Sequence, residues 1–315
     1  MCYPKVIFVS ALLLFSIAAA SSVQGASIAG WGDNFFEQIN VPPGNDFTAI
    51  DSNGNYSLGL KSDGSLVGWS FVDVPDGNDF VAIAAGYFHS LALRSDGSLV
   101  GWGDNPYGET DVPAGNNFIT IAAGYEFSLA LRSDGSLVGW GYNVNGQTNV
   151  PAGNDFTAIA AGVAHGLALR NDGSLVGWGA NGSGQTDVPA GHNFIAIAAA
   201  GSHNLALRSD GSLVGWGANF EGQTDVPPGN DFTAIATGSD HSLALRSDGT
   251  LIGWGSNSLG QINVPDGTFM AIAAGDTHSL ALRADSLPVP EPLSLLMFGG
   301  IASLAALIIQ HHRQG

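Results

Sequence analysis

One position of the repeating sequence carries a histidine in most of its copies and is the first candidate for chemistry. Imidazoles brought together could bind a metal ion or respond to pH. In two copies the position holds Tyr or Phe, and neither completes an ordinary zinc ligand set. We therefore expect a ring that packs at the start of a strand, with a metal- or proton-binding ring as the alternative. The position comprises Tyr56, His89, Phe127, His165, His203, His241 and His278.

A basic residue also recurs once per copy, in most cases just before an Asp-Gly pair. Seven cations on one surface could bind an anion. Each of them is followed two residues later by an Asp, so we expect local pairing on that face instead, although the spacing alone does not identify the pairs. The basic residues are Lys61, Arg94, Arg132, Arg170, Arg208, Arg246 and Arg283.

The sequence shows no catalytic constellation. Ser, His and Asp recur through the repetition itself, and no copy breaks the pattern. The Asp-Gly and Gly-Asn-Asp segments lack the alternating ligands of a calcium loop. Cys2, the only cysteine, precedes an apolar run, which leaves the mature chain without thiol or disulfide chemistry. We expect no enzymatic activity, no cofactor and no metal ion.

The positions that fail to repeat are the better candidates for binding. They form two adjacent pairs per copy, one just before the histidine position and one after the tryptophan, and aromatic residues concentrate in the early copies. Exposed hydrophobic side chains grouped on loops are typical of interaction sites, although they could instead pack on their own repeats. The candidate binding residues are Phe35, Phe36, Tyr87, Phe88, Tyr107, Tyr125 and Glu126.

The elements that position these residues belong to an internal repeat. The seven tryptophans of the chain are separated by 38 residues in every interval but one, which spans 33. A fixed period of this size indicates a solenoid or a propeller. The tryptophans are Trp31, Trp69, Trp102, Trp140, Trp178, Trp216 and Trp254.

Each repeat predicts strands joined by tight turns. In the copy from 156 to 189, the segments 156–162, 165–170 and 174–178 have strand patterns, and Asp172-Gly173 is a strong hairpin signal. The segment ending at Pro189 can form only a short outer strand, because proline lacks an N–H. Four crossings per repeat describe the blade of a propeller. The loop after the Ala-rich strand and the loop after Trp then lie on one face, and the Asp-Gly turns lie on the other.

The order of strands predicts how the ring closes. The chain begins with a Trp-bearing strand at 28–31 and ends with the first two strands of a blade, the last of them at 278–283. We therefore expect an all-β fold, a seven-bladed β-propeller closed by shared N- and C-terminal strands, with small Ala-rich strands around the axis. The short repeat lacks the loop after Trp69, so we expect a notch beside Tyr87 and Phe88.

The two ends of the chain predict export. Residues 1–25 have one lysine, a 15-residue apolar run and a polar exit, typical of a secretory signal peptide. The apolar run from Leu293 to Ile309 could barely cross a bilayer as a helix, at about 1.5 Å per residue. We expect three parts: a signal peptide (1–25), the propeller (26–285) and a tail (286–315), which an ordinary membrane anchor would also explain.

That tail resembles the PEP-CTERM sorting signal of Gram-negative bacteria. The resemblance is carried by Val289, Pro290, Glu291 and Pro292, by the apolar run and by Arg313 as the single terminal arginine, where the family usually has several. It implies that an exosortase recognises and removes the tail, which touches the membrane transiently. The protein would then lie at the cell surface or in the extracellular matrix, and would stay membrane-anchored if the tail is kept.

The repeat itself, Gly-Trp-Gly-x-Asn-x-x-Gly-Gln followed by Ala-Ala-Gly-x-x-His-Ser-Leu-Ala-Leu, resembles the regulator of chromosome condensation repeat. Its short period and Val-Pro connectors are most similar to the bacterial propeller β-lactamase inhibitor family. That resemblance implies seven mostly three-stranded blades and, in the inhibitors, aromatic loop residues that hold the target enzyme.

Charge limits the partners. The chain has 27 acidic residues against 9 Lys and Arg, a formal net charge of −18, which disfavours nucleic acid and anionic lipid. We expect an exported, non-enzymatic propeller that binds an extracellular protein or polysaccharide through its loop face. The alternatives are an inhibitor of a secreted or periplasmic hydrolase and, with only the versatility of the fold behind it, a glycan-active enzyme.

Overall fold

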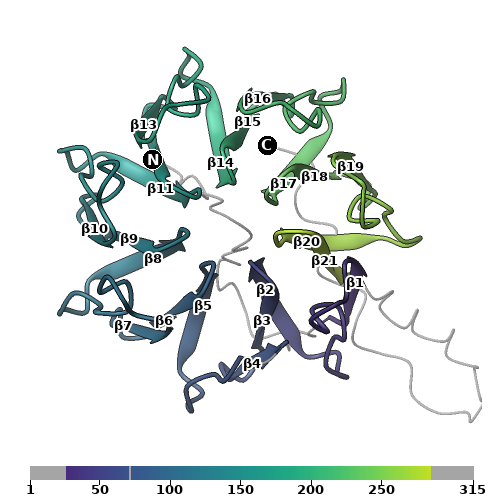
Figure 1. The fold of residues 1–315 in the computed structure, drawn as a ribbon, viewed down its shortest axis with the longest axis horizontal. Helices are drawn as coiled ribbons and strands as arrows, with labels where there is room; N and C mark the ends of the chain where they lie inside the picture. Colours follow the sequence, from purple (N-terminus) through teal and green to yellow (C-terminus); the bar gives the residue numbers. More distant parts are fainter. Residues whose placement is uncertain (1–25, 71, 285–315) are drawn as a thin grey trace, which may run out of the picture. The chain divides into compact units, whose positions relative to one another are not determined.

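The computed structural model describes residues 26–70 and 72–284, which form 21 strands in seven antiparallel sheets (Figure 1). The expected signal peptide and sorting tail lie outside the described residues. The sheets are arranged around a central axis as the blades of a propeller, as expected from the seven repeats. We number the blades 1 to 7 in chain order of their innermost strands.

The innermost strands face the axis because their side chains are small. They alternate Ala with Ile, and space near the axis of a ring admits little more. These strands are β2 (Phe47–Asn53), β5 (Phe80–Ala85), β8 (Phe118–Ala123), β11 (Phe156–Ala161), β14 (Phe194–Ala200), β17 (Phe232–Thr237) and β20 (Phe269–Ala274).

The middle strands are almost completely buried and begin at the histidine position. They are β3 (Tyr56–Lys61), β6 (His89–Arg94), β9 (Phe127–Arg132), β12 (His165–Arg170), β15 (His203–Arg208), β18 (His241–Arg246) and β21 (His278–Arg283). The outer strands carry the tryptophans. They are β4 (Leu66–Trp69), β7 (Leu99–Gly103), β10 (Leu137–Gly141), β13 (Leu175–Gly179), β16 (Leu213–Gly217), β19 (Leu251–Gly255) and β1 (Ile28–Gly32).

The ring closes in blade 7, as the strand order predicts. Strand β1 pairs with β21 from the other end of the chain, in the register Ile28 with Leu282 and Gly32 with His278. The sheet order is β1-β21-β20, so the outer strand of this blade comes from the N-terminal side and the inner two from the C-terminal side. Pairing of this kind removes the open sheet edges that an unclosed stack would expose.

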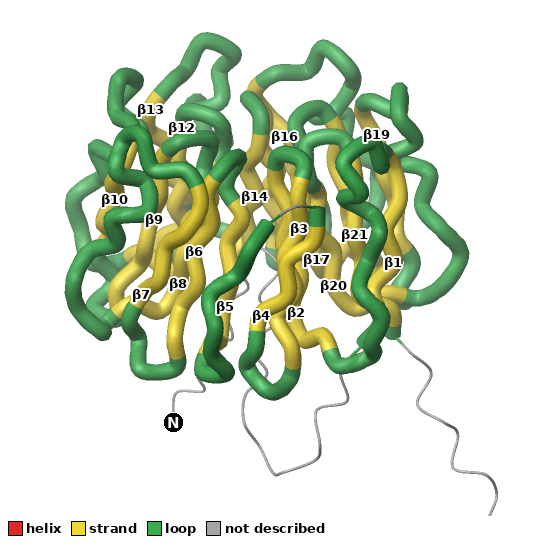
Figure 2. The backbone as a smooth tube through the Cα atoms, turned by 60° about the horizontal axis from the view of Figure 1, so that its bottom comes forward, coloured by secondary structure: helices red, strands yellow, loops and turns green. Residues whose placement is uncertain are grey.

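The expected fourth strand is absent from every blade within the described residues, and each sheet has three strands. In blade 4 the amide of Val188 donates to the carbonyl of Thr186 (2.9 Å) and is therefore diverted from a ladder. The same segment lies against Gly177 of β13, where a Cβ would come within 3.0 Å of the Thr186 backbone. Proline and this close packing replace strand pairing. Figure 2 shows the segments outside the sheets as loops around the ring.

The hydrophobic core lies between the blades. Each of seven buried clusters combines side chains of two neighbouring blades; one joins Leu167 and Leu169 of blade 4 to Phe194 and Ile197 of blade 5. Trp31 and Trp69 are buried and the other tryptophans half-buried. Ile, Leu and Trp side chains therefore fill the space between blades.

On the turn face, the basic residues pair with a different Asp from the one two residues downstream. Arg170 Nη1 lies 2.6 Å from Asp155 of the preceding connector and its guanidinium stacks over Phe156. Asp172 instead accepts hydrogen bonds from the amide and hydroxyl of Ser174 in its own turn (2.9 and 2.7 Å). The same ion pair recurs between Lys61 and Asp46, Arg94 and Asp79, and Arg246 and Asp231. Local pairing is thus confirmed for these four, with connector aspartates as partners.

No helix capable of spanning a bilayer occurs within 26–70 and 72–284.

Candidate functional site

Polar residues connect each blade to the next through a repeated set of hydrogen bonds. At the junction of blades 2 and 3, His89 Nε2 lies 2.9 Å from Ser128 Oγ, which donates to the carbonyl of Glu109 (2.9 Å). The indole Nε1–H of Trp140 donates to the same carbonyl (2.8 Å). The loop after one blade's tryptophan therefore supplies a backbone carbonyl to the next blade.

The same arrangement appears at four further junctions. In each set the histidine bonds to a polar residue of the next blade, which we call the relay residue, and the relay residue and the tryptophan both donate to one backbone carbonyl. The sets, in the order histidine, relay residue, residue with the accepting carbonyl and tryptophan, are His165, Asn204, Gln185 and Trp216; His203, Ser242, Gln223 and Trp254; His241, Ser279, Gln261 and Trp31; and His278, Ser57, Gln38 and Trp69.

The hydrogen bonds define the form of the histidines. Because Ser128 uses its proton on Glu109, it accepts from His89 Nε2, so the neutral ring carries its proton there. The Nδ1 atoms of His89, His165, His203, His241 and His278 are buried and have no partner among the described residues. Burial lowers the pKa of all five, to about 4 for His89, His203 and His278 and to about 3 for His241. These rings join neighbouring blades.

At the junction of blades 3 and 4 the ring is not histidine, and the neighbouring residue changes with it. Phe127 has no N–H to donate, and the relay position of the next blade is Gly166, against which the Trp178 ring packs. Trp178 still donates to the carbonyl of Gln147 (2.8 Å). The tryptophan contact is therefore independent of the histidine relay.

The junction of blades 1 and 2 lacks the carbonyl altogether. The repeat that begins at Trp69 is five residues shorter than the others and has no Asn-x-x-Gly-Gln loop. Trp102 Nε1 is buried and has no acceptor among the described residues, in contrast to the six other tryptophans. Tyr56 replaces the histidine, and its hydroxyl lies 2.5 Å from the carbonyl of His89 and 2.8 Å from Ser90 Oγ.

A groove of about 770 Å³ opens at this junction, where the short repeat predicts a notch. Phe36, Tyr87 and Phe88 line it together with Trp102 and Ser90. Its acidic members are Asp73 and Asp104, and its remaining lining residues include Asn55, Tyr56, Ser70, Val72, Val74, Pro75 and Gly103. Its volume is in the range that accommodates a small ligand or a peptide segment.

Three of the predicted aromatic residues form one cluster at the groove. The ring of Tyr87 lies 4.6 Å from that of Phe88 and 4.4 Å from that of Tyr125, and Phe88 lies 5.8 Å from Tyr125. Phe88 is 49% exposed, although it contacts both tyrosines. The amide of Tyr87 donates to the carbonyl of Gly124 in the next blade (3.2 Å), which holds the cluster in place. We call Tyr87, Phe88 and Tyr125 the aromatic cluster.

The other predicted residues lie elsewhere on the loops. Phe35 is 82% exposed and packs edge-on against Phe36 (4.9 Å). Tyr107 stacks on Tyr142 (4.7 Å) and does not line the groove. Glu126 is half-buried, and burial together with the charge of Glu109 raises its pKa.

Ser70 has a strained backbone because it occupies a position where every repeat has a positive φ. Its φ is +74°, at a position where the six full-length repeats have glycine. A non-glycine residue rarely adopts this conformation. The Ser70 hydroxyl donates toward the carbonyls of Phe36 and Asn55 (2.5 Å to Asn55), which ties together two loops on the groove wall.

Replacement of Trp102 and of Trp140 by phenylalanine should affect stability differently. Trp140→Phe removes a satisfied hydrogen bond and should lower the free energy of unfolding by about 1 kcal/mol. Trp102→Phe removes a buried donor without a partner and should change it by less than about 0.5 kcal/mol. Urea denaturation of the two variants measures the difference, and equal losses would show that Trp102 is hydrogen-bonded like the others.

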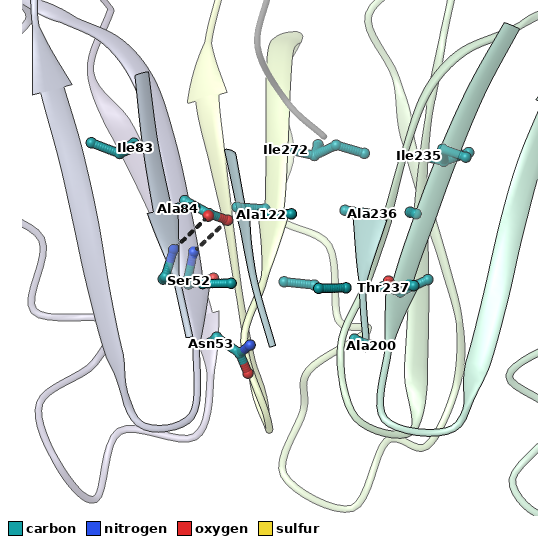
Figure 3. Close-up of a pocket in the computed structure, with 18 of the residues that line it drawn as sticks. Ser52, Asn53, Ile83, Ala84, Ala122, Ala200, Ile235, Ala236, Thr237 and Ile272 are labelled. Atoms are coloured by element: carbon teal, nitrogen blue, oxygen red, sulfur yellow. Dashed lines mark hydrogen bonds between the residues drawn. The ribbon is translucent and has the colours of Figure 1, made fainter. Parts of the chain in front are cut away.

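One carboxyl interrupts the alanine pattern at the axis. Asp51 and Ser52 occur in blade 1 where the blade 2 strand has Ala84 and Ala85. Figure 3 shows this axial pocket of about 80 Å³, with Ser52 and Asn53 among its small neighbours. Asp51 accepts hydrogen bonds from the amides of Ser52 and Ala85 (both 2.9 Å), yet burial raises its pKa to about 7.

Asp51→Ala should stabilise the protein at neutral pH and above, and should make its loss of stability on acidification steeper. The folded protein holds the Asp51 proton up to about pH 7, whereas the unfolded chain releases it near its ordinary value of 3.8. The native carboxyl thus costs stability as pH rises from about 4 to 7. The variant should gain about 4 kcal/mol at pH 8 and almost nothing at pH 4. Denaturation at the two pH values tests this, and a gain at both would point to packing instead.

Several residues of this region escaped the sequence interpretation. Asp51 is a copy that breaks the repeat, contrary to the expectation that none does, and comparison of the inner strands would have found it. Trp102 looked like the other tryptophans because its difference lies in the loop missing from the neighbouring blade. Tyr142 lies next to an outer strand and belonged to neither variable pair.

Comparison with known proteins agrees with this architecture. Residues 80–109, 118–147, 156–185, 194–223 and 232–261 match the model of the Regulator of chromosome condensation (RCC1) repeat. No curated protein matches the sequence.

Among solved structures, Prp20p of Saccharomyces cerevisiae, described with its binding to Gsp1p and histones, has 19% identity and a TM-score of 0.72, over 84% of this chain and 93% of that one. Human WBSCR16 has 17% identity and a TM-score of 0.68, over 82% and 99%. The ectodomain of the receptor kinase CR4 from Physcomitrella patens has 23% identity and a TM-score of 0.62, over 72% and 66%. The TM-scores of these three structures show that they share the fold of this chain.

Proposed function

Since the chain carries RCC1 repeats, we propose that it is an exported, non-enzymatic binding propeller that uses the groove between blades 1 and 2 to hold an extracellular protein or polysaccharide. The observation that supports this most is the aromatic cluster, which lies beside the groove at the short repeat. In the other repeats the loop after Trp covers the equivalent place.

The chemistry of the groove favours binding. Clustered aromatic side chains supply large contact area at little cost in conformational entropy and often dominate binding energy. Asp73 and Asp104 add negative charge to a chain whose formal net charge is −18, which favours partners with basic groups. The yeast neighbour Prp20p, of the same fold, binds Gsp1p and histones, so the fold is compatible with protein recognition.

The location is part of the proposal and is supported by the two ends of the sequence. A signal peptide at 1–25 and a sorting tail at 286–315 would place the propeller at the surface or in the matrix of a Gram-negative bacterium, with an exosortase as the processing partner. The intact mass of the surface-extracted protein tests it: loss of both ends agrees, and retention of both would contradict processing.

Tyr87→Ala combined with Phe88→Ala should reduce partner capture at least tenfold, because the two rings supply most of the apolar surface of the cluster. The full chain is used to capture proteins and glycans from the envelope and matrix of the producing bacterium. Phe220→Ala is the matched control, because Phe220 is 86% exposed on another blade and does not line the groove.

Both variants should unfold at nearly the temperature of the wild type. Equal capture by the double variant and the wild type would overturn the proposal. Loss of capture in Phe220→Ala as well would assign binding to the loop face in general rather than to the groove.

A further inference from the structure

The six full-length repeats show what the short repeat is missing. At each of their junctions a loop places the backbone carbonyl of a Gln or Glu 2.8–3.1 Å from the indole Nε1 of the next blade's tryptophan. At the junction of blades 1 and 2 the tryptophan remains, its Nε1–H buried and unpaired among the described residues, while the loop is deleted from the sequence. A buried donor of this kind costs free energy until an acceptor reaches it.

The other polar groups of this wall already pair with each other. The Tyr56 hydroxyl donates to the carbonyl of His89 (2.5 Å), so Ser90 directs its own proton to the Tyr56 oxygen (2.8 Å). Trp102 and Ser90 both line the groove, but Ser90 is only 1% exposed. The indole N–H of Trp102 is therefore the group of this wall that a peptide carbonyl would satisfy.

We propose that the groove binds an exposed loop of a partner protein, which donates a backbone carbonyl to Trp102 Nε1–H at the place that Gln or Glu occupies elsewhere in the ring. This inference rests on the proposed binding function and names its ligand class. Figure 1 shows the junction concerned, between the blade of β2, β3 and β4 and the blade of β5, β6 and β7.

The surroundings define the side chains of that loop. Tyr87 and Phe88 on one wall and Phe36 among the other lining residues favour an apolar or cationic side chain. Asp73 and Asp104 favour Lys or Arg close to the bound carbonyl. The ligand is therefore a basic loop rather than an acidic one.

The test uses a cyclic peptide with the sequence of residues 179–189, carrying Gly182→Lys and Ser183→Lys for the expected charge. The full chain is labelled with ¹⁵N in its tryptophan indoles, and the Trp102 signal is assigned by its loss in Trp102→Phe. We expect the Trp102 indole proton to move downfield on addition of the peptide while the six other indole signals stay in place. Trp102→Phe should weaken peptide binding at least tenfold.

Two matched controls isolate the carbonyl and the groove. A peptide whose Gln185 carbonyl is replaced by a methylene should bind at least tenfold more weakly than the parent peptide. An insertion of the five residues Asn-x-x-Gly-Gln after Phe71, which restores the loop of the full-length repeats, should abolish peptide binding and move the Trp102 signal downfield in the free protein. Its unfolding transition reports whether this variant folds, and Trp102→Phe tests the inference independently of it.

Three results would overturn the inference. They are an unmoved Trp102 signal, equal binding of the parent and reduced peptides, and a Trp102 signal that responds to oligosaccharides of the producer's matrix but not to the peptide. Failure here differs from failure of the binding function. If Tyr87→Ala with Phe88→Ala loses its partner while the insertion variant keeps it, the cluster binds and the groove does not.

Discussion

Acidification from pH 7 to pH 4 should unfold the propeller in a steep transition. Five neutral histidines are buried between blades, and their Nδ1 atoms have no partner among the described residues. Burial lowers the pKa of all five, to about 4 for His89, His203 and His278 and to about 3 for His241. The unfolded chain takes up these protons near its ordinary value of 6.5, and the folded protein does not. Stability is complete above about pH 6.5 and is lost as pH falls toward 4.

The magnitude follows from the number of protons. Each of the four histidines with a pKa of about 3 or 4 contributes about 1.4 kcal/mol per pH unit in this window, so the four give about 5–6 kcal/mol per pH unit, and His165 acts in the same direction. Asp51 acts in the opposite direction, because its raised pKa makes the folded protein bind a proton below about pH 7. One such group offsets about one histidine, so the histidines decide the outcome. Circular dichroism against pH, with the proton uptake of unfolding measured by titration, checks this.

The chain provides its own control for the acid transition. His203→Phe with Ser242→Gly reproduces the junction in which Phe127 faces Gly166, and should remove about one proton from the uptake and make the transition less steep. Acid unfolding that is insensitive to this pair, or absent down to pH 4, would contradict the assignment of the neutral rings.

Trp31→Ala should be among the most destabilising single substitutions, with a loss of about 3–5 kcal/mol in the free energy of unfolding. Trp31 is 7% exposed, packs in the cluster that contains Leu243 and Ile272, and donates to the carbonyl of Gln261 (2.9 Å). Its strand β1 is held to β21 only by noncovalent contacts, since the two strands come from opposite ends of the described chain. Weakening it should open the ring.

Urea denaturation and hydrogen exchange measure this effect. Amides of β21 should lose protection in Trp31→Ala before those of the other middle strands. Trp140→Ala is the control, because β10 is joined to β9 by a tight turn and stays in its blade. Equal loss of protection around the ring in both variants would show that closure has no special weakness.

The repeat made most of the fold predictable. The spacing of the tryptophans, the Ala-rich strands and the Asp-Gly turns predicted seven blades, and the strand order predicted closure through Trp31. The expected fourth strand was wrong because the Val-Pro segments pack on outer-strand glycines such as Gly177 without pairing. The choice between pairing and packing depends on contacts that a pattern within one repeat does not contain.

The site was predictable only in outline. The missing loop beside Tyr87 and Phe88 predicted the groove, but not the clustering of Tyr125, which comes from the next blade. The consequence for Trp102 depends on a hydrogen bond between residues 31 positions apart in the other repeats, such as Glu109 and Trp140. The unpaired Nε1–H of Trp102 can be recognised only after the carbonyl that accepts from the tryptophan in the other repeats has been identified.

The most direct test of the binding site is capture by the full chain with and without the five-residue insertion after Phe71. Both proteins carry the same aromatic cluster and differ in whether a loop fills the groove. We predict that the wild type captures its partner from the producer's envelope and matrix, and that the insertion variant, folded and at least as stable, captures at least tenfold less. Equal capture by the two proteins would contradict the assignment of the groove as the binding site.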